Sequence, residues 1–238
     1  MDMSGDLRFS HTIVIDASRQ RVWDALTSPA ERNKYVCTEN QADLRAGGAF
    51  IEVFQYGPAR AGVFLVVDEP NRLVQENFVF DRGTSHRYYN AFTLANSLGG
   101  TSLTIDVEGF SRNDSEDWLR ESMYVGWKTE LKVLKAYVET GADIRPQVWK
   151  GVLMGLRFVS SEDPAGVRVI DVIANTPAAA AGLRTGDVIG GVDGTKVADF
   201  IEFRDRMGGF SPGDSACFQV TRDGDTADYA ITFGNAIG

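Results

Sequence analysis

Histidine and cysteine are scarce in this sequence, with two of each among 238 residues. Transition-metal sites and histidine-dependent hydrolases need several such side chains close together, and the sequence contains no such cluster. It also contains no glycine-rich phosphate-binding loop. Cys37 and Cys217 lie far apart in the chain, so they do not indicate a disulfide framework. The sequence therefore predicts no metal site, no cofactor and no catalytic residue.

Long hydrophobic segments are missing as well. No run approaches the roughly 18 consecutive apolar residues that a membrane-spanning helix requires. The segment that begins at Met1 lacks the basic and then apolar order of a secretory signal. We therefore expect a cytoplasmic protein without a membrane span.

The sequence has no excess of basic residues. The 24 lysines and arginines and 33 acidic residues give a formal net charge of -9, which argues against nucleic-acid binding as the main function. Apolar residues make up 43% of the chain and charged residues 24%, so the chain can bury a core. At roughly 100–200 residues per domain, the length suits two domains.

A long amphipathic helix is predicted over Ser115–Thr140, where apolar residues recur at spacings of three and four. Gly141 is suited to end this helix. The polar, proline-containing segment Gly141–Gln147 follows and is typical of a linker. We therefore place a domain boundary near residue 144, with one domain at 1–144 and a second at 145–238.

The first half has the composition of a mixed α+β domain. A strand at Phe9–Asp16 precedes two short helices, which begin near Ala17 and Ser28. Short turns connect the strands that follow, so the sheet is expected to be antiparallel, with the terminal helix covering one face. These strands are predicted at Ala49–Gln55, Ala61–Val67, Arg72–Phe80, Arg87–Leu94 and Ser102–Glu108.

Several segments of this half resemble the START-like (SRPBCC) superfamily, and within it the heat-shock-protein-90 ATPase-activator-like family. The resemblance spans residues 7–141 and implies a helix-grip fold, in which a curved sheet wraps a long C-terminal helix around a cavity. The segments that carry it are Ile15–Ala17, Val22–Pro29, Gly47–Phe50, Asp68–Leu73, Gly100–Leu103, Glu108–Phe110 and Gly126–Trp127.

The resemblance implies that the cavity holds an apolar small molecule or a partner protein, and the family name suggests a chaperone as a partner. A set of aromatic residues is the candidate lining, although ordinary packing between helix and sheet explains the same residues. The set comprises Trp23, Phe54, Tyr89, Tyr124 and Trp127.

Acid–base chemistry in this half would depend on acidic residues at alternating strand positions and on one histidine. The acidic residues are Glu52, Glu76, Asp106 and Glu108, which are also typical of the solvated face of a sheet. His86 is a candidate proton donor, and its place near a turn favours a surface position.

The second half resembles a PDZ domain of the bacterial, protease-associated type over residues 148–234. Pro177 suits the first turn of a helix, and Gly182 suits its end. The turn at Asp193–Gly194 and a short helix at Phe200–Met207 follow. The resemblance is carried by the pattern Thr-Pro-Ala-x-x-Ala-Gly-Leu-x-x-Gly-Asp-Val-Ile, at Thr176–Ile189.

PDZ domains bind a peptide end as an added strand, with its carboxylate held by backbone N–H groups of a loop. Leu153, Met154, Gly155 and Leu156 match that loop, and Arg157 and Phe158 then begin the pairing strand. An alternative register places the loop at Gly155–Phe158. The last peptide side chain would enter a pocket, although domain core explains the same residues; the pocket residues are Leu156, Phe158, Phe203 and Met207.

Three functions are compatible with these features. We favour a non-catalytic two-domain adaptor, in which the first domain binds an apolar small molecule or a partner protein and the second binds a peptide or protein C-terminus. One alternative is an enzyme with hydrolase or cyclase chemistry in the first domain and targeting by the second. The other is a co-chaperone-like interaction protein without a ligand.

Overall fold

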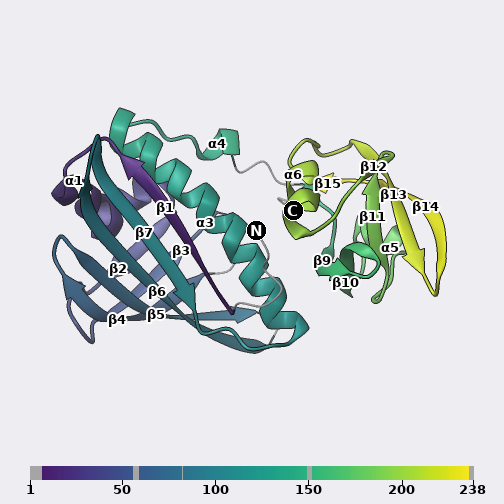
Figure 1. Cartoon of the computed structure of the whole chain (residues 1–238), viewed down its shortest axis with the longest axis horizontal. Coiled ribbons are helices and arrows are strands. Elements are labelled where there is room, and N and C mark those ends of the chain that lie inside the picture. The colour runs from purple at the N-terminus through teal and green to yellow at the C-terminus, as the bar shows by residue number, and fades with distance from the viewer. Residues whose placement is uncertain (1–6, 56–58, 82, 149–151, 236–238) are drawn as a thin grey trace. The chain divides into compact units, whose positions relative to one another are not determined.

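The computed structural model describes residues 7–55, 59–81, 83–148 and 152–235. The chain divides into two compact units (Figure 1). The first comprises residues 1–112 and 122–149, and the second comprises residues 113–121 and 150–238. None of the helices in the described ranges is long and apolar enough to cross a membrane.

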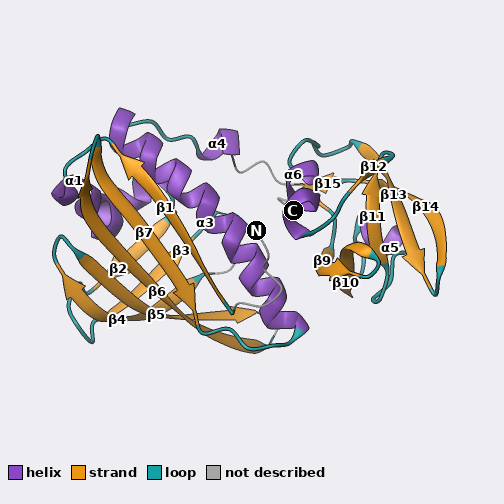
Figure 2. Ribbon diagram, in the orientation of Figure 1, coloured by secondary structure: helices purple, strands orange, loops and turns teal. Residues whose placement is uncertain are grey.

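The first unit contains a seven-stranded antiparallel sheet, drawn in orange in Figure 2. Its strands run in the order β1-β7-β6-β5-β4-β3-β2, so all neighbours except β1 and β7 are consecutive in sequence. This arrangement confirms the α+β class expected for this half. The strands are β1 (Arg8–Ile15), β2 (Glu39–Ala42), β3 (Ala49–Val53), β4 (Arg60–Asp68), β5 (Arg72–Asp81), β6 (Thr84–Ser97) and β7 (Gly100–Glu108).

Local sequence signals explain where the helices of the first unit begin and end. The side chain of Ser18 accepts a hydrogen bond from the N–H of Arg21 at the start of α1 (Arg19–Thr27). Proline occupies the first position of α2 (Pro29–Tyr35), where its missing N–H costs nothing. The long helix α3 (Asp114–Thr140) is followed by Gly141 at φ +74°, and a short helix α4 (Arg145–Val148) comes next.

Alternation along the strands separates an inner face of the sheet from an outer one. The inner face carries buried Leu103, Ile105 and Val107 on β7, and buried Phe92 on β6. Trp127 of α3 packs edge-on against Phe92, with ring centroids 5.5 Å apart. The long helix therefore covers the inner face, as the helix-grip fold requires.

The second unit contains a six-stranded antiparallel sheet and a separate two-stranded pair. Five strands follow the open path β14-β13-β11-β10-β9, and β12 pairs with β11. Among the described strands this path does not close into a barrel. The strands are β9 (Leu156–Glu162), β10 (Ala165–Val172), β11 (Val188–Val192), β12 (Thr195–Lys196), β13 (Ser215–Arg222) and β14 (Asp225–Thr232), with β8 (Val152–Leu153) paired to β15 (Gly234–Asn235).

Two short helices complete this unit, α5 (Pro177–Ala180) and α6 (Phe200–Met207). Asp199 caps α6, because its side chain accepts a hydrogen bond from the N–H of Glu202 at 2.9 Å. The inner side of α6 packs into a cluster of buried aromatic rings. This cluster contains Phe158, Phe200, Phe203 and Phe218.

Candidate functional site

The loop before β9 contains a glycine whose backbone conformation few other residues can adopt. Gly155 has φ +86°, a conformation that residues with a side chain rarely adopt. A Cβ at this position would lie 2.1 Å from Oγ1 of Thr176, so glycine is required for steric reasons as well. The resemblance to PDZ domains placed Gly155 in the predicted loop, and the φ angle and the nearby Thr176 side chain explain why no larger residue fits there.

The carbonyl oxygens of Met154 and Gly155 in this loop both accept backbone hydrogen bonds. The carbonyl oxygen of Met154 accepts from the N–H of Ala178 at 3.0 Å, and that of Gly155 accepts from the N–H of Ile173 at 2.9 Å. Within the described ranges, no hydrogen bond is found from the N–H of Met154 or of Gly155. These two N–H groups are the donors that the predicted loop would offer to a carboxylate.

The strand that follows this loop lies at the edge of the sheet. β9 pairs with β10 and ends the five-strand path, with Leu156 opposite Val172 and Phe158 opposite Val169. An edge strand is the element to which an extended peptide adds. Leu153 is exposed, and Met154, Leu156 and Arg157 are half-buried.

Most of the predicted pocket residues belong to the core of this unit. The rings of Phe158 and Phe203 are in edge contact with centroids 4.7 Å apart. The side chains are 3% exposed for Phe158, 0% for Phe203 and 7% for Met207, while Leu156 is half-buried. These exposures agree with the alternative that Phe158, Phe203 and Met207 are core residues, and the peptide pocket stays a prediction.

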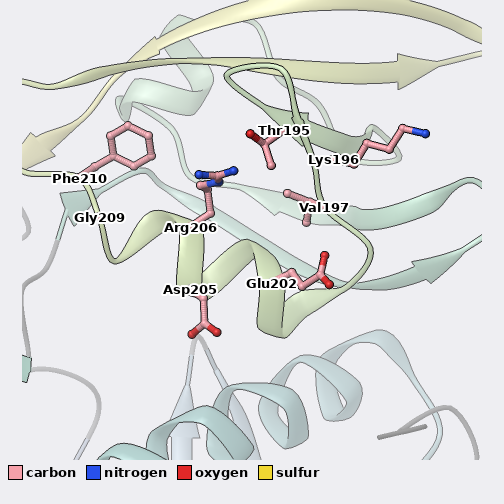
Figure 3. A pocket seen from close by; sticks show the side chains of 8 residues that line it. All are labelled: Thr195, Lys196, Val197, Glu202, Asp205, Arg206, Gly209 and Phe210. Carbon is pink, nitrogen blue, oxygen red and sulfur yellow. The ribbon is translucent and has the colours of Figure 1, made fainter.

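A pocket of about 590 Å³ lies beside α6 and β12 (Figure 3). In this view the guanidinium of Arg206 points towards Thr195 and the ring of Phe210, whereas Asp205 points away. The carboxylate of Glu202, also in the lining, accepts the N–H of Ala198 at 2.9 Å and so belongs to the start of α6. This pocket was not predicted from the sequence, and its lining residues are mostly exposed and polar.

The aromatic residues predicted to line the first unit's interior occupy several different places. Trp23 is buried on α1. Phe54 and Trp127 lie on Arg60, whose guanidinium carbon is 5.3 Å and 5.1 Å from the two ring centroids. Tyr124 of α3 packs against the ring of His11 at 4.4 Å.

Tyr89 corrects the prediction, because it lies on the outer face of the sheet. Alternation along β6 turns its neighbours Tyr88 and Asn90 inward and Tyr89 outward, where its hydroxyl donates to Glu76 at 3.2 Å. Tyr89 lines a hollow of about 800 Å³ on this outer face, together with Asp106 and Glu108. Tyr89 therefore does not line the interior.

An ion-pair network is buried inside the first unit. Glu52 on β3 forms an ion pair with Arg32 of α2, with an N–O distance of 2.5 Å, and accepts a hydrogen bond from Nε of Arg60 on β4 at 2.6 Å. Arg32 also reaches Glu130 of α3 at 3.0 Å, so the network joins two helices and two strands. The exposed fractions of Arg32, Glu52 and Arg60 lie between 3% and 6%, which excludes the solvated position considered for Glu52.

The charge state of this network follows from its burial and its pairing. Burial acts to raise the pKa of Glu52, but the charges of Arg32 and Arg60 outweigh it and hold this pKa below its ordinary value. Glu52 is therefore ionised at neutral pH. Burial raises the pKa of the nearby Cys37 thiol to about 11, so this thiol is protonated and unreactive at neutral pH.

Next to this network, the inner face of the sheet carries four adjacent polar residues, which we call the inner polar patch. Gln75 lies opposite Asn90, and Asn77 lies opposite Tyr88, on the neighbouring strands β5 and β6. Their exposed fractions are 7%, 0%, 0% and 1% for Gln75, Asn90, Asn77 and Tyr88. Within the described chain, no hydrogen-bond partner is found for either polar atom of the Asn90 side chain or for the side-chain oxygens of Gln75 and Asn77.

The buried ion-pair network and the inner polar patch were not predicted from the sequence, although the alternation of residues along the strands indicates which side chains point inward. Glu52 stands two residues after the apolar Phe50, and Asn90 stands two residues before Phe92, so each pair shares a face. His86 belongs to the same inward series on β6 and is 2% exposed, which corrects the surface position favoured for it. Among the described residues, no group of three or more His, Cys, Asp and Glu side chains could hold a metal ion.

Comparison with protein families agrees with the two units. The model of the family described as "Activator of Hsp90 ATPase homolog 1-like protein" matches residues 16–139. The model of the PDZ domain matches residues 152–232. Each match falls within the half that the sequence patterns had assigned to it.

Individual relatives match only part of this chain. The chain is 34% identical over 144 residues to a "Probable periplasmic serine endoprotease DegP-like" protein of Hahella chejuensis, covering 58% of this chain and 30% of that protein. It is 35% identical over 71 residues to a protein of the same description in Ectopseudomonas mendocina, covering 30% of this chain and 15% of that protein. The chain thus spans less than a third of the length of either relative.

A solved structure supports the fold of the first unit. Protein MLL2253 from Mesorhizobium loti covers 57% of this chain and 98% of its own, with 19% identity and a TM-score of 0.51. At this identity the likeness concerns the fold alone. The first family model matches more than half of the residues of the present chain, and a PDZ domain follows that match. This chain therefore belongs to the Activator of Hsp90 ATPase homolog 1-like family.

Proposed function

We propose that this chain is a two-part binding protein whose PDZ unit binds the C-terminal end of a peptide as an added strand beside β9. One observation carries the proposal, namely the two N–H groups of Met154 and Gly155, which lie next to an edge strand. A terminal carboxylate needs aligned donors of this kind. Leu156 is half-buried, and Phe158, two residues further along the same strand, packs against Phe203, so we expect a preference for an apolar last residue.

The first unit is the second binding part of the protein in this proposal. Its helix-grip interior contains buried polar groups beside aromatic rings, as is expected of a site that holds a small molecule. We keep a cytoplasmic location as part of the proposal, while the printed descriptions of the two relatives name the periplasm for those proteins.

Fluorescence anisotropy with labelled peptides that end in valine or leucine tests the peptide site. Each peptide is prepared with a free terminal carboxylate and as the amide. Charge-assisted hydrogen bonds contribute about 1.5–3 kcal/mol, so the amide is expected to bind roughly ten- to a hundredfold more weakly. Equal affinity for both forms would remove the assignment of the carboxylate loop.

Two glycine variants of the full chain complete this test. Gly155→Ala is expected to abolish peptide binding, because the new Cβ meets Thr176 and φ is +86°. Gly182→Ala is the matched control, because Gly182 has φ +80° in the same unit but nothing within 4 Å of an added Cβ. Peptide affinity that survives Gly155→Ala, or that falls equally in both variants, contradicts the proposed loop.

A further inference from the structure

The start of α3 belongs to the second unit, which comprises residues 113–121 as well as residues 150–238. Asp114, Trp118 and Glu121 follow each other at spacings of four and three residues, so they share one face of the helix, which we call the α3 contact face. The carboxylate of Asp114 accepts two hydrogen bonds from the guanidinium of Arg168 on β10, at 2.7 Å and 3.0 Å. The guanidinium carbon of Arg157 on β9 is 4.3 Å from the ring centroid of Trp118. The α3 contact face therefore contacts side chains of both β9 and β10.

Glu121, the third residue of this face, occupies a backbone donor of β9. Its carboxylate accepts a hydrogen bond from the N–H of Ser160 at 3.0 Å, and Glu121 is only 4% exposed. The hydroxyl of the same serine accepts a hydrogen bond from the N–H of Phe200, at the start of α6, at 3.0 Å. Ser160 is thus bonded to α3 through its backbone and to α6 through its side chain.

The backbone of Phe158, two residues before Ser160, faces the edge of the sheet. Phe158 lies opposite Val169 on β10. The N–H of Val169 donates to the carbonyl of Asp187, and its own carbonyl accepts from the N–H of Gly186, so both groups point away from β9. In an antiparallel pair of this kind the groups of the opposite residue also point outward. The N–H groups of Phe158 and Ser160 therefore lie on the side where an added strand would pair.

These positions determine how much of a peptide can pair with β9. A peptide whose carboxylate is bound at Leu153–Leu156 has its end at the start of β9, so it runs antiparallel to the strand and pairs at every second residue. Its last residue then lies beside Leu156, its third-last beside Phe158 and its fifth-last beside Ser160. The carbonyl of the fifth-last residue would need the N–H that already donates to Glu121.

We propose that the α3 contact face closes the peptide site at Ser160, so that the PDZ unit recognises only the last four residues of a C-terminus. This limit rests on the proposed peptide site and adds a specificity-determining residue to it. Glu121 is that residue, because its carboxylate fills the hydrogen-bonding position that a longer peptide would use. Residues further from the end of the peptide then add no backbone pairing with β9.

Calorimetric titration of the full chain with two peptides tests the limit. Both peptides are acetylated and end in valine with a free carboxylate; one has four residues, and the other has eight and ends in the same four. We expect affinities that agree within about threefold, since one added hydrogen bond would contribute roughly two- to tenfold. A larger preference for the long peptide overturns the limit and leaves the peptide site in place. Binding of neither peptide removes the peptide site and the limit together.

Two substitutions of Glu121 identify the residue that sets the limit. Glu121→Ala releases the N–H of Ser160, so the long peptide should now bind roughly three- to tenfold more tightly than the short one. Glu121→Gln is the matched control, because it removes the same charge but keeps a side-chain oxygen that can accept from Ser160. It should bind both peptides with similar affinity. Similar affinities in Glu121→Ala, or the same preference for the long peptide in both variants, contradict the role of Glu121.

Backbone amide signals of the unaltered chain supply a readout that does not depend on the folding of a variant. The signal of Phe158 should move on binding of either peptide. The signal of Ser160 should move by the same amount with the four-residue and the eight-residue peptide, because Glu121 retains its N–H in both complexes. A larger movement of the Ser160 signal with the eight-residue peptide would show that the peptide displaces Glu121, and it overturns the proposal.

Discussion

At the scale of single residues, burial rather than residue type decides which charged groups matter. Glu52 and Asp106 are both acidic residues on strands of one sheet, yet Glu52 is 3% exposed and Asp106 is exposed. Glu52 forms ion pairs with Arg32 and Arg60, whereas Asp106 lines the hollow on the outer face of the sheet. Removing one partner of a buried ion pair leaves the other charges without compensation, and this penalty is far larger than that of losing a surface charge.

We expect Glu52→Gln to lower the free energy of unfolding by about 3–5 kcal/mol, because Arg32 and Arg60 would remain buried without a full counter-charge. Urea denaturation followed by tryptophan fluorescence measures the change. Asp106→Asn is the control and should stay within about 0.5 kcal/mol of the unaltered chain. Similar effects of the two substitutions would show that the network contributes no more than the surface does.

Glu31 gives a residue-scale prediction for pH. Hydrogen bonds from Lys34 above all, and then from Tyr137 and Arg21, lower the pKa of Glu31 to about 2, against the opposing effect of burial. The folded-state pKa is thus below the value of about 4.3 expected in the unfolded chain. The resulting stabilisation is present above about pH 4.3 and is lost as the pH falls towards 2.

Glu31→Gln should therefore flatten the acid limb of the stability curve between about pH 4.3 and 2. At neutral pH the loss should be about 0.5–1 kcal/mol, since the Glu31 side chain is 21% exposed and solvent screens the pairs. Urea denaturation at a series of pH values measures both effects, with the exposed Glu108→Gln as the control. An acid limb as steep as that of the unaltered chain contradicts the role assigned to Glu31.

At the scale of secondary structure, boundaries could be predicted wherever a capping signal is strong. The helix predicted over Ser115–Thr140 is α3 at Asp114–Thr140, and the predicted Phe200–Met207 coincides with α6. β6 extends from Thr84 to Ser97, beyond the predicted Arg87–Leu94, because pairing with β5 and β7 continues into its polar ends. β2 was not predicted, since Glu39–Ala42 has little strand propensity and depends on pairing with β3.

The cap of α6 gives a prediction at this scale. Asp199→Ala removes the side-chain acceptor for the N–H of Glu202, so we expect a loss of about 1 kcal/mol in the stability of the second unit. Thermal unfolding followed by circular dichroism measures it. Asp205→Ala, at an exposed position within the same helix, should cost much less. Equal losses in both variants would mean that the cap does not hold the start of α6.

At the scale of the whole molecule, the sequence was sufficient for the fold class and the two families but not for the chemistry inside the first unit. The fold class could be predicted from the order of the motifs, because turns, helix caps and the spacing of apolar residues are local features of the sequence. The inner polar patch depends on which strand lies beside which, and only the register of β5 with β6 brings Gln75 to Asn90. The carboxylate loop stays a prediction, and it could be proposed from the sequence because its residues, Leu153–Leu156, are contiguous.

The central claim is that the PDZ unit binds a peptide end through the loop before β9, and backbone amide shifts of the full chain test it most directly. Titration with a peptide that ends in valine and a free carboxylate should move the amide signals of Met154, Gly155 and Leu156 most strongly, followed by those of β9. The same peptide as an amide should move them much less. Saturable binding that leaves Met154 and Gly155 unmoved, with shifts gathered at the pocket of Thr195 and Arg206 or in the first unit, would contradict the account.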